Sequence, residues 1–312
     1  MKDLFGNEIV DKKIIERERL TTVFIDTIRN ISQDELVSML YSRYEAIIDF
    51  ASLCSGDRTG EKISMIFNPH RYATRTNKSK SIIEAFSDKN FLSGLARATL
   101  FKNGKVKELL YQVLQLGING VQYVNDFPPY VAQQIFIDYS AKQILDPCCG
   151  WSGRMIGAAS VGAFYHGFEP ATNTFNGLQK LGTFLKSFQN GFDFKIENLP
   201  FEEAMLTGQY DVALTSPPYY DTEIYSDEES NSCNRYKSFE EWKNKFYFVM
   251  IEKATSHCRE VVLNVGSRQY DLKSPLFSKY NAREIKTKLS GKGGLGRDES
   301  GKEGFFVIQG AV

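Results

Sequence analysis

The stretch that sets the fold is QILDPCCGWSGR, which runs from Gln143 to Arg154. It begins as an apolar run, turns tightly after Pro147, and continues into a pattern typical of a helix. Gly150 and Gly153 let the backbone approach a ligand closely, because neither carries a Cβ. In a parallel sheet, ligands bind beyond the carboxyl ends of the strands. We therefore take this turn as a candidate ligand site.

Short apolar runs and helical patterns alternate along the chain, beginning with the run that leads into this turn and continuing toward the C-terminus. The candidate strands are Gln143–Leu145, Ala163–Phe168, Phe192–Ile196, Tyr210–Leu214 and Val261–Val265. Helical patterns separate several of them, at about 152–161, 172–187 and 239–257. This alternation predicts an α/β protein with a parallel sheet that is covered by helices on both faces. Two further candidate strands, about 283–289 and 304–309, flank a Gly-rich loop and would form a hairpin at one sheet edge.

The N-terminal third reads as helical instead. Helical patterns cover about 13–30, 79–87, 90–101 and 105–117, and Ser32 with Glu35 forms a capping-box pattern. The sequence pattern changes near residue 120, and a further helix is expected after Asp126. We therefore predict an N-terminal helical domain, residues 1–119, with a possible role in substrate recognition, and a second domain, residues 120–312.

An acidic residue strengthens the case for a ligand at the glycine turn. Glu169 follows the second candidate strand and lies 19 residues after Gly150. An acid at this spacing is placed to accept hydrogen bonds from ribose hydroxyls. The turn lacks the GxGxxG of a dinucleotide site, and the sequence contains no GxxxxGK[ST] phosphate loop. An adenosyl ligand without a pyrophosphate therefore fits better than NAD or ATP.

Two similar proline segments occur in the chain, and only the second suggests chemistry. Phe127-Pro128-Pro129-Tyr130 precedes a helix, where proline is common. Ser216-Pro217-Pro218-Tyr219 follows the apolar run that ends at Leu214, so it lies at the same sheet edge as the glycine turn. Its prolines would stiffen the loop and leave Tyr219 and Tyr220 facing a crevice.

At this point the chain resembles a known family, the S-adenosylmethionine (SAM)-dependent amino-methyltransferases of DNA. Residues 215–221 look like their (D/N/S)PP(Y/F) catalytic motif, and residues 146–153 look like their SAM motif in the DPCxGWxGR form of phage-type members. Residues 127–132 resemble the FxPxxA segment that holds the methionine end of SAM. The order of the three motifs matches a circularly permuted class. The resemblance covers about residues 120–312.

The resemblance implies a doubly wound, seven-stranded, Rossmann-like methyltransferase sheet with SAM as cofactor. The residues that it assigns to the cofactor are Asp146, Cys148, Gly150, Gly153, Glu169, Phe127 and Pro129. Those that it assigns to catalysis are Ser216, Pro217, Pro218 and Tyr219, with Tyr220 contacting the substrate. Cys148 stands where the family usually has Phe, and Ser152 replaces the second family glycine. A side chain at Ser152 would crowd the cofactor or pass the glycine's role to Gly153.

The chemistry of the family explains why these residue types are needed. An exocyclic amine on a base is a poor nucleophile, because its lone pair is delocalised into the ring. If the Ser216 hydroxyl and the Pro217 carbonyl accept its two N–H bonds, the lone pair localises on nitrogen. Tyr219 would stack on the base, which must be flipped or single-stranded to reach the site.

The charge distribution bears on the substrate. Lys+Arg and Asp+Glu both total 38, and a net charge of zero excludes a globally basic nucleic-acid binder. Locally, residues 70–110 hold nine Lys/Arg against three Asp/Glu. We expect phosphate contacts from Lys288–Arg297 and from four basic residues, Arg71, Arg75, Lys78 and Lys80. Residues 220–236 are acidic and would form either a lid over the base or a solvated connector.

DNA is the favoured substrate, with cytosine N4 ahead of adenine N6. Members of the family with Ser before Pro-Pro more often modify cytosine, so the preference for cytosine is an inference by analogy. The alternatives are methylation of RNA or of a protein glutamine, and a relic of the fold that binds nucleic acid without catalysis. Ser152 is the feature that favours the relic.

Cysteine, histidine and hydropathy patterns complete these expectations. The five cysteines include an adjacent pair and form no CxxC, which favours a reducing compartment. The three histidines show no ligand spacing, so we expect no metal site. The N-terminus is too polar for a secretory signal, and no apolar run is long enough to span a membrane. We therefore predict a protein of the bacterial or phage-infected host cytoplasm.

Overall fold

The computed structural model describes residues 12–29, 32, 34–35, 38, 42–75, 80–101, 126–222, 224–267, 269–285 and 303–312. The chain forms two compact units, one of residues 1–40 and 72–124 and the other of residues 41–71 and 125–312. The sequence predicts a single boundary near residue 120. In the structure, residues 41–71 group with the sheet instead, because α3 (Arg43–Cys54) and α4 (Glu61–Phe67) pack against helices that cover it.

The smaller unit is helical. It contains α1 (Lys12–Arg29), α5 (Ile82–Phe86) and α6 (Lys89–Phe101), and α1 lies against α6. Ser81 and Glu84 form a capping box that starts α5. The expected box at Ser32 and Glu35 is also present, since each backbone N–H bonds to the other residue's side chain. The helix expected at 105–117 lies outside the described residues.

The larger unit is built on a seven-stranded sheet with the order β3-β2-β1-β4-β5-β7-β6. The strands are β1 (Gln143–Asp146), β2 (Phe164–Phe168), β3 (Asp193–Glu197), β4 (Tyr210–Thr215), β5 (Cys258–Val265), β6 (Arg283–Ile285) and β7 (Gly304–Gln309). Strands β1 to β5 are parallel, and β7 runs antiparallel to β5 and β6. This order confirms the expected doubly wound, seven-stranded, Rossmann-like sheet.

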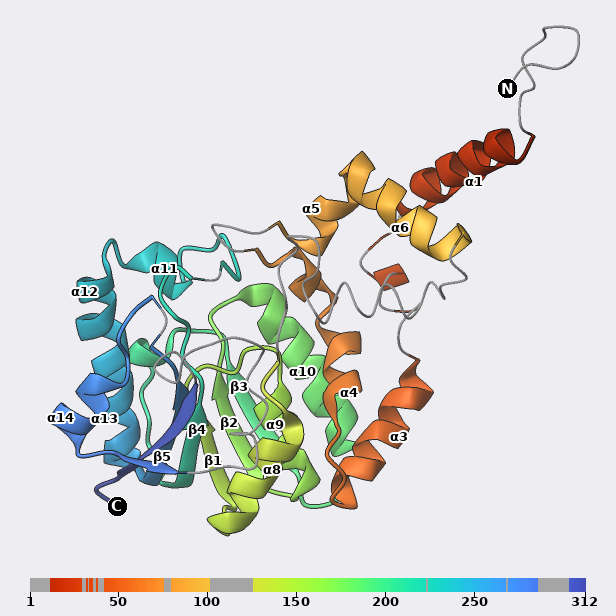
Figure 1. The fold of residues 1–312 in the computed structure, drawn as a ribbon. Helices are drawn as coiled ribbons and strands as arrows, with labels where there is room; N and C mark the ends of the chain where they lie inside the picture. Colours follow the sequence, from red (N-terminus) through yellow and green to blue (C-terminus); the bar gives the residue numbers. More distant parts are fainter. Residues whose placement is uncertain are drawn as a thin grey trace, which may run out of the picture. The chain divides into compact units, whose positions relative to one another are not determined.

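Helices cover both faces of the sheet (Figure 1). One face carries α8 (Pro129–Asp138), α9 (Gly153–Ser160) and α10 (Thr172–Lys186), while the other carries α12 (Phe239–Trp242), α13 (Phe248–His257) and α14 (Ser274–Tyr280). Successive strand residues point to opposite faces, so Ile144 belongs to one apolar core and Leu145 to the other. The strands read as continuous apolar runs because both faces are buried.

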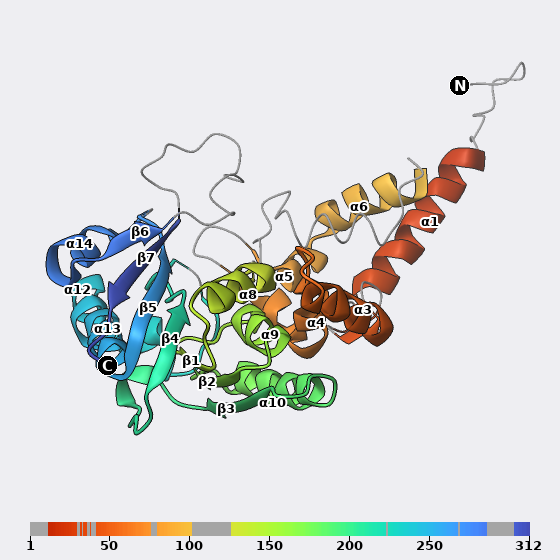
Figure 2. The same ribbon diagram turned by 90° about the horizontal axis from the view of Figure 1, so that it is seen from below.

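The last two strands pair antiparallel at one side of the sheet, as predicted, with β7 next to β5 and β6 at the edge (Figure 2). One helix differs from the sequence prediction. The helix expected at 239–257 includes a π-helical turn, η4 (Lys243–Tyr247), between α12 and α13. Short helices η1 (Pro69–Ala73), η3 (Phe201–Glu203) and α11 (Ser232–Arg235) complete the described elements. Among these elements, no helix is long and apolar enough to cross a membrane.

Strand order fixes where the candidate site lies. Strands β1 and β4 are parallel neighbours, with Ile144 opposite Val212 and Leu145 opposite Ala213. The chain leaves β1 toward β2 on one side and returns to β4 on the other, so the strand order reverses between them. Such a reversal opens a crevice at the carboxyl ends of the strands.

Candidate active site

The turn after β1 is shaped by two residues with positive φ. Gly150 has φ 56° and Ser152 has φ 100°, a conformation that side-chain-bearing residues rarely adopt. Ser152 is fully buried and its hydroxyl has no hydrogen-bond partner. Ser152 thus adopts a backbone conformation that glycine favours.

Gly153 has a separate reason to be glycine. A Cβ at this position would lie 1.7 Å from the carbonyl oxygen of Phe127. One turn later, a Cβ on Gly157 would lie 2.5 Å from the Cβ of Ala132 and 2.9 Å from the carbonyl oxygen of Pro129. The segment with Phe127 and Pro129 is therefore packed directly on the start of α9, beside the turn.

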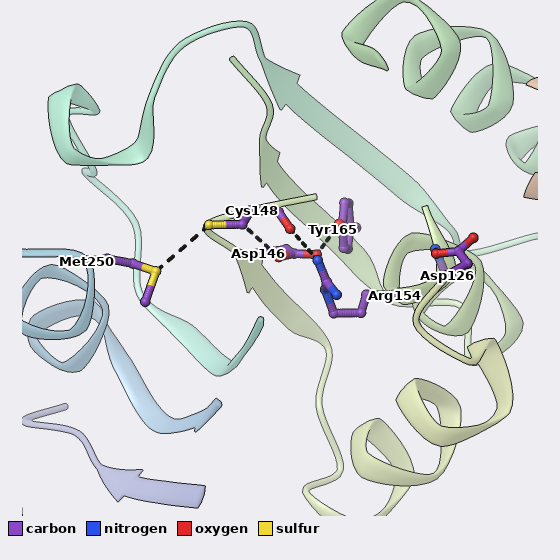
Figure 3. A network of polar contacts seen from close by, with 7 residues as sticks. Asp126, Asp146, Cys148, Arg154, Tyr165 and Met250 are labelled. Carbon is purple, nitrogen blue, oxygen red and sulfur yellow. Dashed lines mark hydrogen bonds and ion pairs between the residues drawn. The ribbon is translucent and has the colours of Figure 1, made fainter. Parts of the chain in front are cut away.

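Asp146 organises the turn (Figure 3). Its Oδ2 accepts hydrogen bonds from Arg154 Nε at 2.7 Å and from the Tyr165 hydroxyl at 2.6 Å. Its Oδ1 accepts the backbone N–H of Cys148 at 3.2 Å, and Arg154 also donates to the Cys148 carbonyl. The carboxylate is completely buried and both of its oxygens are engaged by the protein. Asp146 therefore positions the turn, and Cys148 within it.

Glu169 lies directly after β2, at the same sheet edge. Its carboxylate accepts the backbone N–H of Ala171 at 2.9 Å, and a bond from the Gly150 N–H also lowers its pKa. Burial outweighs these bonds and raises the pKa of Glu169 to about 8. Asn198 fixes the backbone here, since its Nδ2 donates to the Glu169 carbonyl at 2.9 Å. Glu169 is thus a buried acid beside the glycine turn.

Two further polar side chains lie at the end of β3, Glu197 as its last residue and Asn198 directly after it. Glu197 accepts from Lys195 Nζ at 2.6 Å and is 2.8 Å from His166 Nε2. On its other side the His166 ring is 2.6 Å from the Tyr210 hydroxyl. Protein groups thus engage both Glu197 and Asn198.

The Ser216-Pro217-Pro218-Tyr219 segment follows β4 without a gap. Ser216 and Pro218 are half-buried, and Pro217 is buried. The Tyr219 hydroxyl accepts the backbone N–H of Gly266, just past β5, at 2.8 Å. The tyrosine is therefore anchored across the sheet edge from the neighbouring strand, which holds its ring in one orientation.

Tyr220 also has a strained backbone, with φ 52°. Its hydroxyl donates to the Tyr236 carbonyl at 3.2 Å. Its ring lies in an aromatic cluster with centroid distances of 5.6 Å to Tyr270, 6.3 Å to Phe239 and 6.2 Å to Trp242. The residue after the proline motif is thus held by α12 and by the loop after β5.

Arg71 corrects one sequence prediction. It was expected on an exposed basic surface, but its side chain is completely buried and its Cζ lies 5.4 Å from the centroid of the Trp151 ring. It cannot contact a phosphate backbone from there. A charge pattern in sequence does not reveal which basic residues are buried.

Two of the other residues predicted to contact phosphate are not buried as Arg71 is. Arg75 and Lys80 are exposed, and Lys80 pairs with Asp88 at 3.2 Å. Lys78 and the range 288–297 lie outside the described residues.

The acidic segment 220–236 is partly tied down. Glu228 accepts from the Thr172 N–H at 3.0 Å and from its hydroxyl at 2.7 Å, at the start of α10. Arg235 pairs with Glu203 on η3. Both contacts attach the segment to the sheet unit.

Three residues near the turn were not singled out by sequence as site residues. Asp126 Oδ1 accepts the backbone N–H of Gly153 at 3.2 Å. His70 stacks edge-on against Trp151, with its Nε2 2.9 Å from the Thr174 hydroxyl, and burial lowers its pKa to about 4. Asn68 donates to the Trp151 carbonyl at 3.1 Å. The only signal for Asp126 was its place before the Phe-Pro-Pro segment.

Comparisons with known proteins give structural matches only. No protein-family model and no curated protein matches the chain. Among solved structures, magnesium protoporphyrin IX methyltransferase from Synechocystis with bound SAM is similar at 12% identity and TM-score 0.40, over 59% of this chain and 79% of that one. A human methyltransferase 10 domain containing protein matches at 11% and 0.38, over 57% and 80%. TrmN from Thermus thermophilus matches at 14% and 0.38, over 59% and 49%. Similarity at this level assigns no substrate to the chain.

Proposed function

We propose that this chain is a SAM-dependent methyltransferase that modifies an exocyclic amine of a DNA base, with cytosine N4 favoured over adenine N6. One observation carries the proposal. The glycine turn after β1 and the Ser216–Tyr219 segment after β4 follow neighbouring parallel strands, so they share one edge of the sheet. A donor site and an acceptor site for a methyl group must lie side by side in this way.

Residues at this edge fit the adenosyl part of SAM. Glu169 is a buried carboxylate that can accept further hydrogen bonds, as ribose hydroxyls require. The hydroxyl of Ser152, in the turn between β1 and α9, is buried without a hydrogen-bond partner. Buried polar groups normally have partners, so such an orphaned group is consistent with a polar ligand. When bound, SAM would supply a methyl group on an already activated sulfonium.

The protein's own contribution would be orientation and charge stabilisation. The Ser216 hydroxyl and the Pro217 carbonyl would accept the two N–H bonds of the target amine. Positive charge develops on that nitrogen as the new bond forms, so both contacts strengthen in the transition state. Tyr219, fixed by Gly266, would provide a stacking surface for a base flipped out of its helix.

Mass spectrometry of nucleosides tests the proposal. Wild type and Ser216→Ala would each be incubated with SAM and, separately, with duplex DNA, single-stranded DNA, RNA or a glutamine-containing peptide. We expect N4-methylcytosine in DNA from wild type and much less from the variant. Product only in RNA or only on glutamine would replace the proposed substrate. SAM binding without any product would indicate a non-catalytic relic of the fold.

A further inference from the structure

The outer side of β3 is an edge of the sheet. Among the described strands only β2 pairs with β3, which ends the strand order beside α10 (Figure 2). The C=O of Glu197 accepts the N–H of Glu169, just past β2, at 3.0 Å. Backbone groups alternate in direction along a parallel ladder, so Lys195 also turns its N–H and C=O toward β2. Phe194 and Ile196 therefore turn theirs outward.

Side chains of the protein cap two of these four outward groups. The Phe194 N–H donates to Asp193 Oδ1 at 2.8 Å, and the Ile196 C=O accepts from Gln179 Nε2 at 3.3 Å. Within the described part of the chain, the Phe194 C=O and the Ile196 N–H have no bond. Open edges are usually blocked along their length. Here the capping leaves one acceptor and one donor free, on either side of Lys195.

A groove of about 640 Å³ runs along this edge. Its walls include Gln179, Thr183 and Lys186 of α10 and Phe194, Lys195 and Ile196 of β3. The three α10 residues are spaced four and three apart, so they share one face of the helix. A strand that paired with β3 would lie about 4.8 Å from it, on the side where the groove is.

The two free groups suit one residue of an extended peptide. In a parallel pairing this residue would donate to the Phe194 C=O and accept from the Ile196 N–H, while in an antiparallel pairing its two neighbours would do so. In either direction its side chain lies opposite Lys195, on the same face of the sheet. The Lys195 side chain is 57% exposed and pairs with Glu197 at 2.6 Å. Because exposed pairs are weak, an incoming acid can share this lysine.

A second copy of the chain does not fit this edge. A two-fold antiparallel pairing through the two free groups would place Lys195 directly opposite Lys195 of the second copy, and like charges in that position are destabilising. A pairing centred on Phe194 would instead break the bond from its N–H to Asp193. The edge therefore favours a different chain with an acidic residue at the central position.

We infer that the outer edge of β3 and its groove bind an extended segment of a partner protein, which adds a strand to the sheet and places an acidic side chain opposite Lys195. Main-chain bonds supply affinity in such pairing, and alternate side chains supply specificity. No step of the proposed methyl transfer uses this edge, so the inference stands apart from the proposed function.

Fluorescence anisotropy with labelled nonapeptides tests the inference. The probe is SQTVEVTQS, with SQTVKVTQS as its charge-reversed form and SQTPEPTQS as a form that keeps the acid but cannot pair as a strand. Wild type should bind the glutamate peptide about fivefold more tightly than the lysine peptide, the scale of a cross-strand charge pair. The proline peptide should not bind. Hydrogen exchange at the Ile196 amide should slow when the glutamate peptide is bound.

Variants of the central lysine provide the controls. Lys195→Ala should bind the glutamate and lysine peptides alike, and Lys195→Glu should reverse the preference. Lys180→Glu makes the same charge change at an exposed position of α10 outside the groove walls, and it should keep the wild-type preference.

Four outcomes would overturn the inference. The first is no binding of the glutamate peptide by wild type up to about 1 mM. The second is an unchanged preference in Lys195→Ala, and the third is binding that leaves exchange at Ile196 unaltered. The fourth is self-association of wild type that slows this exchange without peptide, because the occupant would then be a second copy. Methyl-transfer activity is not measured in any arm, so the proposed function succeeds or fails separately.

Discussion

Ser216 and Tyr219 belong to one motif, but the structure gives them different attachments. Ser216 is half-buried beyond the end of β4, whereas Tyr219 is hydrogen-bonded to the neighbouring strand end through Gly266. Substitution of Ser216 should therefore impair the methyl-transfer step, whereas substitution of Tyr219 should reduce the rigidity of the site.

Ser216→Ala should lower turnover by roughly 10²-fold or more, the scale seen when one preorganised partner of a developing charge is lost. SAM affinity should stay near that of wild type, because the hydroxyl would contact the target amine and not the cofactor. Single-turnover kinetics with labelled SAM measures the first quantity and calorimetry the second. Transfer at the wild-type rate would show that the segment is only a structural turn.

Tyr219→Phe keeps the ring but leaves the buried N–H of Gly266 without its acceptor. The variant should lose about 1–3 kcal/mol of unfolding free energy, the penalty for an unsatisfied buried donor. Chemical denaturation measures this loss, and Tyr225→Phe is a control outside the motif. An unchanged unfolding free energy would mean that the Gly266 bond contributes little.

Glu169 should make cofactor binding depend on pH. Its pKa is raised from 4.5 to about 8, so below pH 8 the carboxyl is mostly protonated and accepts fewer hydrogen bonds. SAM affinity should rise with pH up to about 8 and level off above it, while Glu169→Gln should remove this dependence. Calorimetry across pH 6–9 measures both. A wild-type affinity that is flat over this range would contradict a ribose contact by Glu169.

The same shift has a consequence for stability. Between pH 4.5 and about 8 the native state holds a proton on Glu169 that the unfolded chain releases. The contribution of this group to stability is therefore largest at low pH and falls as pH rises through that window.

At the scale of elements, the start of α9 is the tightest point of the site. Gly153→Ala would place a Cβ 1.7 Å from the carbonyl oxygen of Phe127 and force α9 away from the segment before α8. We expect a loss of about 1–3 kcal/mol or more, typical of overpacking, and weaker SAM binding. Ser152→Gly is the matched control in the same turn. It relieves a φ of 100° and removes an unpaired hydroxyl, so it should gain about 1–2 kcal/mol.

Thermal unfolding of the two variants tests this pair. Opposite shifts in melting temperature are expected from neighbouring positions. Equal stability of Gly153→Ala and wild type would show that the contact with Phe127 relaxes easily.

The elements that the sequence predicted well are those with local signals. Runs such as Gln143–Leu145 and Tyr210–Leu214 mark β1 and β4 because strands buried on both faces are continuously apolar. The position of β7 depends on pairing with β5, about 40 residues earlier, and no local pattern encodes it. The burial of Arg71 was missed for a similar reason, since its environment comes from Trp151 and Asp126, far away in the sequence.

At the scale of the whole molecule, the proposed binding of DNA by a protein of zero net charge would require a restricted basic surface. Arg75 and Lys80 remain exposed candidates, and the surface pair of Lys80 with Asp88 is worth little. Replacing Arg75, Lys78 and Lys80 with Ala should weaken DNA binding and reduce the slope of log K against log salt by roughly 0.9 for each lost phosphate contact.

Binding titrations at several salt concentrations measure that slope. Lys245→Ala, an exposed lysine paired with Glu241 on α12, is the control and should leave it unchanged. A wild-type slope in the triple variant would place the DNA-binding surface elsewhere.

The insertion of β7 between β5 and β6 also determines when this sheet can be completed during synthesis. Until Gly304–Gln309 has emerged from the ribosome, β5 presents an open row of backbone N–H and C=O groups and β6 lacks the strand with which it pairs. An open edge of this kind can pair with another chain, so the nascent sheet is prone to aggregation until β7 joins it. Deletion of residues 304–309 should therefore yield chains that aggregate.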